Sequence, residues 1–267
     1  MWIVGTGPIG GGRAGERDRA RLAAALQRAL ERDVEVRAAV TYSELLDWVG
    51  AREVHLAWLG PALFVQAQAR FGVDALVRSE RDGTQSFRGA LFVREDSPRR
   101  APEDLRGAKV AWVDPDSCSG FLFPRLAMSK RGLDPDTTFD VPRILGSHEA
   151  VVRAVAEGVA DVGATFVELR RADDPRSEIV RAGWSGGPCP MRAVLLTEPI
   201  PSDVVVATRA VDPTMRAVLT RGLERLGGDP DGRAVLAQMF QADRLCRVAA
   251  EDYSAVRTAL RAAGVRL

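Results

Sequence analysis

The chain has 267 residues, of which 46% are hydrophobic and 27% are charged, and its formal net charge is +1. This composition is normal for a globular protein, and the length allows one large domain or two lobes of roughly 100–150 residues. A net charge near zero excludes the basic footprint of a nucleic-acid-binding protein, and no apolar run approaches the ~18 residues of a membrane-spanning helix. We therefore expect neither a nucleic-acid partner nor an integral membrane protein.

Short apolar strands alternate with amphipathic helices through the first part of the chain. Helical spacing is clearest where Leu22, Leu26 and Leu30 recur every four residues. Thr41 is a candidate N-cap for the next helix. The expected strands are 2–4, 34–36, 54–59, 73–78 and 87–93, and the expected helices are 16–31, 41–48 and 62–71. This alternation predicts an α/β fold whose sheets are mainly parallel and flanked by helices.

A second α/β block follows from about residue 109. It runs to about residue 194, with expected strands 109–113 and 162–164 and expected helices 121–131 and 149–157. The strand 204–207 and three further expected helices, 213–226, 231–241 and 252–263, follow this block. No internal repeat, coiled coil or low-complexity tract interrupts the pattern.

The strand 109–113 ends in a turn rich in hydroxyl groups, Ser117-Cys118-Ser119-Gly120, directly before a helix. Unpaired backbone N–H groups and the positive end of the helix dipole meet at such a point. The turn therefore predicts an anion-binding site. The plainer alternative, in which Ser117 is an ordinary N-cap, stays open.

The glycine-rich stretch Gly5–Gly12 has the glycine spacing of a dinucleotide-binding loop. The helix register and the acidic ribose partner of that motif are missing, and no Gly-Lys-Ser/Thr of a phosphate loop follows. We expect a flexible connection from strand to helix and no cofactor. The chain has only two histidines, His55 and His148, so we expect no zinc or other metal site.

The three cysteines, Cys118, Cys189 and Cys246, are an odd number without metal-ligand spacing. Idle thiols are the expectation, and a disulfide between Cys189 and Cys246 is the alternative. The first residues, Met1–Gly5, enter a strand without the features of a signal peptide. From this we expect a cytoplasmic protein or a sequence from which the leader has been removed.

Six segments, in order and over almost the whole chain, resemble the phosphonate/phosphite/phosphate-binding proteins of ABC importers, which are PhnD-like proteins with the type II periplasmic-binding-protein fold. These segments are Tyr42–Leu46, His55–Pro61, Asp114–Leu122, Gly146–Ala150, Ala160–Ala164 and Ile200–Asp203. The resemblance implies lobe I from 1–88 plus 203–267 and lobe II from 89–202. Two hinge strands would join the lobes, which close on a ligand in the cleft between them.

The resemblance also implies the residues that hold the phosphonate oxygens. Ser117, Cys118 and Ser119 correspond to the Ser-Thr-Ser helix start of the family, and His148 corresponds to a histidine donor. Cys118 departs from the family pattern because its S–H group is a weak donor.

Four further positions follow from the same resemblance. Tyr42 and Phe87 correspond to two tyrosines, and Phe87 has lost the phenolic O–H. Glu168 and Asp203 correspond to two carboxylates that take the ammonium group of aminoalkylphosphonates. The two weakened donors, at Cys118 and Phe87, would lower affinity by about two to three orders of magnitude or mark a different ligand.

The resemblance implies a non-catalytic, periplasmic solute-binding protein that feeds an ABC permease. A ligand such as 2-aminoethylphosphonate is favoured, because two acids in a low-dielectric cleft would repel a bare oxyanion. Two alternatives stay open on the same fold. One is a cytoplasmic ligand sensor or accessory domain, and the other is a cytoplasmic enzyme with Cys118 as a nucleophile.

Overall fold

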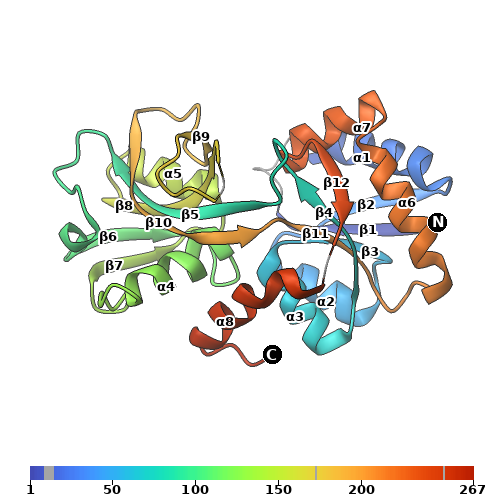
Figure 1. The fold of residues 1–267 in the computed structure, drawn as a ribbon, viewed down its shortest axis with the longest axis horizontal. Helices are drawn as coiled ribbons and strands as arrows, with labels where there is room; N and C mark the ends of the chain where they lie inside the picture. Colours follow the sequence, from blue (N-terminus) through green and yellow to red (C-terminus); the bar gives the residue numbers. More distant parts are fainter. Residues whose placement is uncertain (9–14, 172, 249) are drawn as a thin grey trace. The chain divides into compact units, whose positions relative to one another are not determined.

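The computed structural model describes residues 1–8, 15–171, 173–248 and 250–267, so that residues 9–12 of the expected glycine-rich connection lie outside the described residues. The chain forms two compact units (Figure 1). Unit 1 consists of Met1–Gln85, Pro201–Arg257 and Leu267, and unit 2 consists of Ser86–Ile200 and Thr258–Arg266. The resemblance implies that the whole of 203–267 belongs to lobe I, whereas Thr258–Arg266 groups with unit 2.

The sheet of unit 1 has the strand order β12-β4-β11-β3-β1-β2. Its strands are β1 (Trp2–Thr6), β2 (Val34–Ala38), β3 (Leu56–Leu59), β4 (Asp74–Glu80), β11 (Val204–Ala207) and β12 (Arg244–Arg247). Strand β1 is parallel to β2 and β3, whereas β11 inserts antiparallel between β3 and β4, and β12 is antiparallel to β4. Strands that lie far apart in the sequence therefore complete one sheet.

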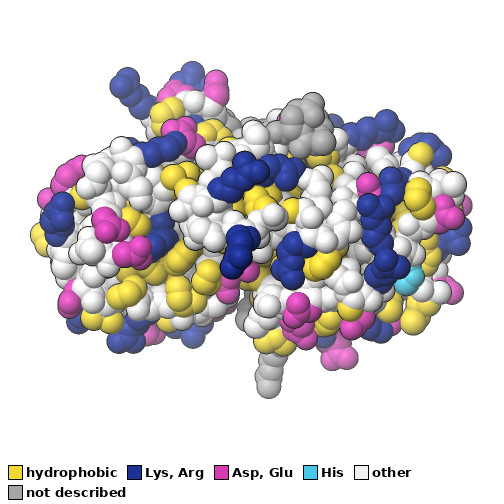
Figure 2. Space-filling model, turned by 90° about the horizontal axis from the view of Figure 1, so that it is seen from below, with side chains coloured by type: hydrophobic (Ala, Val, Ile, Leu, Met, Phe, Trp, Pro, Cys, Tyr) yellow, Lys and Arg dark blue, Asp and Glu magenta, His cyan; other side chains and the backbone are white. Residues whose placement is uncertain are grey.

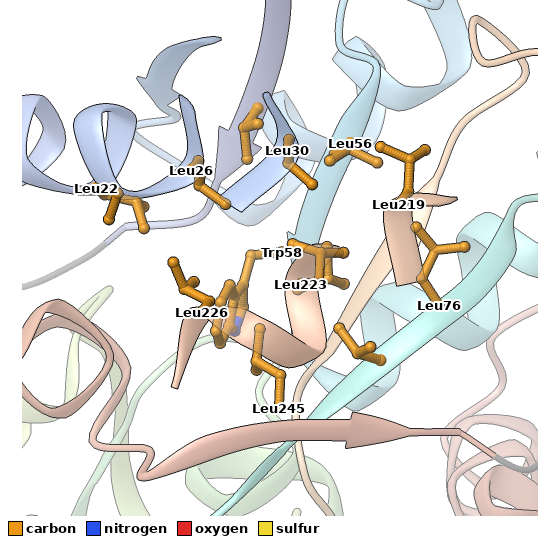
Figure 3. Close-up of a cluster of buried hydrophobic side chains, with 14 of the residues drawn as sticks. Leu22, Leu26, Leu30, Leu56, Trp58, Leu76, Leu219, Leu223, Leu226 and Leu245 are labelled. Atoms are coloured by element: carbon orange, nitrogen blue, oxygen red, sulfur yellow. The ribbon is translucent and has the colours of Figure 1, made fainter. Parts of the chain in front are cut away.

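The helices of unit 1 cover both faces of this sheet: α1, α6 and α7 lie on one side and α2 and α3 on the other (Figure 1). They are α1 (Gly15–Leu30), α2 (Tyr42–Ala51), α3 (Pro61–Phe71), α6 (Arg216–Leu226) and α7 (Pro230–Val235). Figure 3 shows the predicted stripe of Leu22, Leu26 and Leu30 in the buried cluster with Trp58 and Leu223. Burial of this stripe fixes α1 on the sheet, as its four-residue spacing predicts.

The sheet of unit 2 has the order β10-β5-β8-β6-β7, and β9 pairs with β8. Its strands are β5 (Ser86–Arg94), β6 (Ala108–Trp112), β7 (Phe139–Ile144), β8 (Val162–Leu169), β9 (Ile179–Ala182) and β10 (Met191–Pro201). Strand β6 is parallel to β7 and β8, whereas β5 and β9 are antiparallel to β8.

Two helices cover the unit 2 sheet, α4 (Phe123–Ser129) on one face and α5 (His148–Ala156) on the other. The alternation of β5 shows this division, because Leu91 and Val93 pack in the cluster with α4 and Phe92 packs with α5. The helix α8 (Ser254–Ala262) closes the chain. Short 3-10 or π segments occupy Pro102–Leu105, Cys118–Leu122, Pro213–Met215, Leu236–Phe240 and Ala250–Tyr253.

The predicted α/β fold with two helix-flanked sheets is confirmed, with one correction. The sheets are mixed rather than mainly parallel, because β11 and β12 in unit 1 and β5 and β9 in unit 2 run against their neighbours. In the described part of the chain, no helix is both long and apolar enough to cross a membrane.

Candidate ligand-binding site

The turn after β6 is the feature that the sequence singles out. The N–H of Val113 donates to the Gly120 carbonyl at 3.1 Å, and the N–H of Gly120 donates to Ser117 Oγ at 3.0 Å. A wide π turn, Cys118–Leu122, opens the helix and continues into α4. Ser117 is therefore the N-cap, which is the plainer alternative. Its hydroxyl can still donate, because accepting from Gly120 does not use its hydrogen.

Two glycines let this turn close tightly. A Cβ atom on Gly120 would lie 2.3 Å from Cγ2 of Val113, so no other residue fits without a shift. A Cβ atom on Gly89 of β5 would lie 2.9 Å from the carbonyl oxygen of Ser119. The N–H of Gly89 donates to Thr197 Oγ1 at 2.8 Å, which holds β5 in place. The backbones of β5 and the turn are thus in direct contact.

The electrostatics of this helix start suit an anion. Its first turn contains no acidic residue, and Ser117, Cys118 and Ser119 are buried. The first amides of a helix have no intrahelical acceptor and lie at the positive end of its dipole. Asp114 and Asp116 precede the turn, and one Asp114 oxygen already accepts the Asp116 N–H at 2.9 Å. Backbone and hydroxyl donors can therefore hold an oxyanion here.

His148 is the first residue of α5, and Ser147 caps that helix by accepting the Ala150 N–H at 3.2 Å. The Nδ1 atom of His148 lies 2.8 Å from Thr165 Oγ1, and the imidazole ring meets Phe166 edge-on at 5.4 Å. Burial lowers the pKa of His148 to about 4, so the imidazole is neutral at pH 7. The tautomer in which Thr165 donates to Nδ1 leaves an Nε2–H donor for a ligand.

The loop that carries His148 is tied to the same turn. The N–H groups of Leu145 and Gly146 donate to the carbonyls of Trp112 and Val113 at 2.9 and 2.8 Å. Strands β6 and β7 are parallel, so the loops after them meet at the carboxyl edge of the sheet, where α/β proteins bind ligands. Unit 2 thus brings the Ser117–Ser119 turn and His148 to one edge.

Phe87 and Glu168 share a sheet face with this turn. Gly89 pairs with Phe166 and Arg88 pairs with Val167, so Phe87 and Glu168 lie one step beyond these pairs. Side chains alternate along a strand, which puts both residues on the face where Gly89 meets Ser119. Phe87 is half-buried there. Its apolar ring is suited to be a wall beside a ligand.

Glu168, which the resemblance assigns to a ligand ammonium group, forms an ion pair within unit 2. Arg181 lies directly opposite it on β9 and binds it with two nitrogens, Nε to Oε2 at 2.8 Å and Nη2 to Oε1. No sequence pattern pointed to Arg181. The same is true of Thr165 and Gly89.

Tyr42 and Asp203 belong to unit 1, and the other predicted site residues belong to unit 2. Tyr42 is half-buried and opens α2 after the N-cap Thr41. Asp203 accepts from Arg81 Nη2 at 3.2 Å, and Arg81 also donates to Ser202 Oγ and to the Phe240 carbonyl. The second predicted carboxylate therefore has an arginine partner too.

None of the three cysteines forms a disulfide, and Cys246 Sγ lies 3.2 Å from Glu80 Oε2. Within the described ranges, no group of three or more His, Cys, Asp or Glu side chains is arranged to hold a metal ion. Figure 2 shows positive and negative side chains interspersed on the face in view.

A family of phosphonate substrate-binding proteins of ABC transporters, described as periplasmic, matches residues 10–253 of the chain. The chain belongs to this family. The phosphate-import protein PhnD of Mycolicibacterium smegmatis is 29% identical over 143 residues, which are 50% of this chain and 44% of that protein. The matched part therefore spans less than half the length of this curated relative.

Solved structures of the phosphonate-binding type share the fold. The binding protein component of an ABC phosphonate transporter from Pseudomonas aeruginosa superposes with a TM-score of 0.80 at 18% identity, over 97% of this chain and 85% of that one. PhnD1 from Prochlorococcus marinus, in complex with methylphosphonate, gives a TM-score of 0.79 at 17% identity, over 98% of both chains. The predicted type II periplasmic-binding-protein fold is thereby confirmed.

Proposed function

We propose that this chain is a solute-binding protein that holds a small phosphonate or related phosphorus oxyanion and carries out no reaction on it. The observation that carries the proposal is the helix start at Cys118, where the chain supplies backbone and hydroxyl donors and no acid in the first turn. Membership of the phosphonate-binding family supports the same ligand class. Delivery to an ABC permease in a periplasmic setting completes the proposal.

In this function the oxyanion lies against the amides and side chains of Ser117, Cys118 and Ser119. His148 donates from Nε2, while Thr165 holds the imidazole by its other nitrogen. Phe87 forms an apolar wall on the same sheet face. Tyr42 of unit 1 is the further phenolic donor in this proposal, and exclusion of water from the ligand strengthens each polar contact.

The nature of the organic group is the finer part of the proposal. The sequence favours 2-aminoethylphosphonate because two acids need a cation nearby. In the structure Arg181 binds Glu168 and Arg81 binds Asp203, so each carboxylate already has a cationic partner from the protein. A paired acid repels an oxyanion far less than a single charge. We therefore propose a phosphorus oxyanion without a positive charge, such as methylphosphonate, phosphite or phosphate.

Titration calorimetry of the whole chain tests this function. The ligands are methylphosphonate, phosphite, phosphate and 2-aminoethylphosphonate, and sulfate is the control anion. We expect at least one of the first three to bind with a dissociation constant in the micromolar range or below. Thermal unfolding gives a second measurement, since a ligand at 100 times its dissociation constant adds about 2.7 kcal/mol. Binding of none of the four phosphorus compounds would refute the proposal.

A further inference from the structure

The Glu168–Arg181 pair differs from the exposed ion pairs of this protein. The side chain of Glu168 is only 11% exposed and that of Arg181 is 30% exposed, whereas Arg170 and Glu178, on the same hairpin, are 65% and 66% exposed. A bidentate guanidinium–carboxylate pair is among the strongest charge-assisted hydrogen bonds, and burial shields it from solvent screening. The pair is therefore a fixed element of unit 2.

The Glu168–Arg181 pair lies on the same sheet face as part of the candidate site. Glu168 follows Phe166 by two residues on β8, so the two side chains lie on one face about 7 Å apart along the strand. Phe166 contacts His148, and the paired residue Gly89 faces the carbonyl of Ser119. The ion pair thus lies beside the donors that we assign to the oxyanion, and on the same unit.

We propose that Arg181 is a specificity-determining residue that takes the place of a ligand ammonium group. This inference rests on the proposed function, because it concerns which phosphorus oxyanions that site accepts. Both oxygens of Glu168 bind Arg181, so an incoming ammonium has to compete with a guanidinium that is already in place. A ligand without a positive charge meets no such competition. The pair consequently selects for an uncharged organic group, or for none.

The second carboxylate is held less firmly. Asp203 is 27% exposed, and one of its oxygens lies 3.2 Å from an Arg81 nitrogen that also donates to the Phe240 carbonyl. Because Arg81 has several acceptors in unit 1, replacing it would disturb the fold as well as the charge. Arg181 is therefore the better position at which to test specificity.

The test compares two ligands on matched variants. Arg181→Met removes the charge and keeps an apolar stem, Arg181→Lys keeps the charge, and Arg170→Met removes an exposed arginine from the same hairpin. Calorimetry with methylphosphonate and 2-aminoethylphosphonate gives the ratio of their dissociation constants for each protein. We expect Arg181→Met to shift this ratio toward 2-aminoethylphosphonate by about tenfold or more. Arg181→Lys and Arg170→Met should stay within about threefold of the wild-type ratio.

The outcomes separate this inference from the proposed function. A wild type that binds neither ligand, phosphate nor phosphite defeats both. A wild type that binds methylphosphonate and prefers 2-aminoethylphosphonate by tenfold or more overturns the role of Arg181 and leaves the function standing. An Arg181→Met protein that folds and keeps the wild-type ratio overturns that role in the same way. The double variant Glu168→Gln with Arg181→Met should lose the gain, because the released carboxylate is what attracts the ammonium.

Discussion

Helix α2 in unit 1 and the helix that begins at Cys118 in unit 2 both follow a parallel strand, and each has a hydroxyl N-cap. Thr41 Oγ1 accepts the N–H of Glu44 at 3.1 Å, and Ser117 Oγ accepts that of Gly120 at 3.0 Å. They differ in charge. Glu44 reaches back to the Val40 N–H at 2.6 Å, so the start of α2 already holds a carboxylate. The Cys118 helix has no acid in its first turn.

The difference shows that a capped helix start is not in itself an anion site. In unit 1 the positive end of the helix is neutralised from within, which favours stability. In unit 2 the first turn of the helix carries no such acid, and we propose that the ligand oxyanion lies there. The charge of the third helical residue therefore separates the structural start from the candidate binding start.

The largest effect is expected at Gly120 in unit 2, with Gly7 in unit 1 as the matched control. Gly120→Ala puts a Cβ atom 2.3 Å from Val113, so we expect a loss of about 1–3 kcal/mol in stability and at least a hundredfold weaker oxyanion binding. Gly7→Ala meets Leu45 and Tyr42 only at 3.9 Å and should change stability little. Thermal unfolding and calorimetry measure both quantities. Equal losses for the two variants would contradict the tight fit of the unit 2 turn.

The two units can also be compared through the contribution of their histidines to the pH dependence of stability. Burial lowers the pKa of His148 to about 4, and it also lowers the pKa of His55 in unit 1. In the unfolded chain both titrate near 6.5, so below that pH the unfolded state binds protons that the native state does not. Stability should therefore fall as the pH drops from about 6.5 toward about 4, by at most ~3 kcal/mol from His148.

Denaturant unfolding between about pH 4 and pH 7 checks this expectation. His148→Gln should flatten most of the fall, and His55→Gln should flatten a smaller part. An unchanged pH profile in His148→Gln would show that the imidazole is not desolvated as the structure indicates.

Removing the N-cap hydroxyl of each helix should have a smaller effect on stability and on ligand affinity. Ser117→Ala and Thr41→Ala should each cost about 1 kcal/mol of stability, because each loses one N-cap bond. Only Ser117→Ala also removes a donor to the oxyanion, so we expect about tenfold weaker binding there and less than threefold in Thr41→Ala. Similar affinity losses in both variants would mean that the two helix starts are not functionally different.

The smallest effect is expected from removing the carboxylate of Glu44 at the start of α2. Glu44→Gln keeps a side chain of the same shape and removes the charge from the start of α2. We expect a loss of about 0.5 kcal/mol in stability, reduced at high salt, and no change in ligand affinity. A clear gain in oxyanion binding would place a second anion site in unit 1, at a helix start to which we assign a structural role alone.

The sequence predicts those parts of the fold and site that depend on local pattern. The leucine stripe of α1, the caps Thr41 and Ser117 and the hydroxyl-rich turn are each readable over a few residues. Strand β7 is not predicted from the local pattern, because it is an exposed edge strand that contains Pro142. Arg181, the partner of Glu168, could not be predicted either. The register of β8 against β9 decides which residue lies opposite Glu168, and no local spacing encodes that register.

The insertion of β11 between β3 and β4 bears on how the chain reaches its native state. The N-terminal strands cannot form their final sheet until residues 204–207 have left the ribosome, which happens only after nearly all of unit 2 has been synthesised. During translation the edges of β3 and β4 therefore stay unpaired until β11 has been synthesised, and such long-range pairing is slow. Unit 2 is nearly continuous and can acquire structure first. Truncation before β11 should accordingly leave a chain prone to aggregation through its unpaired edges.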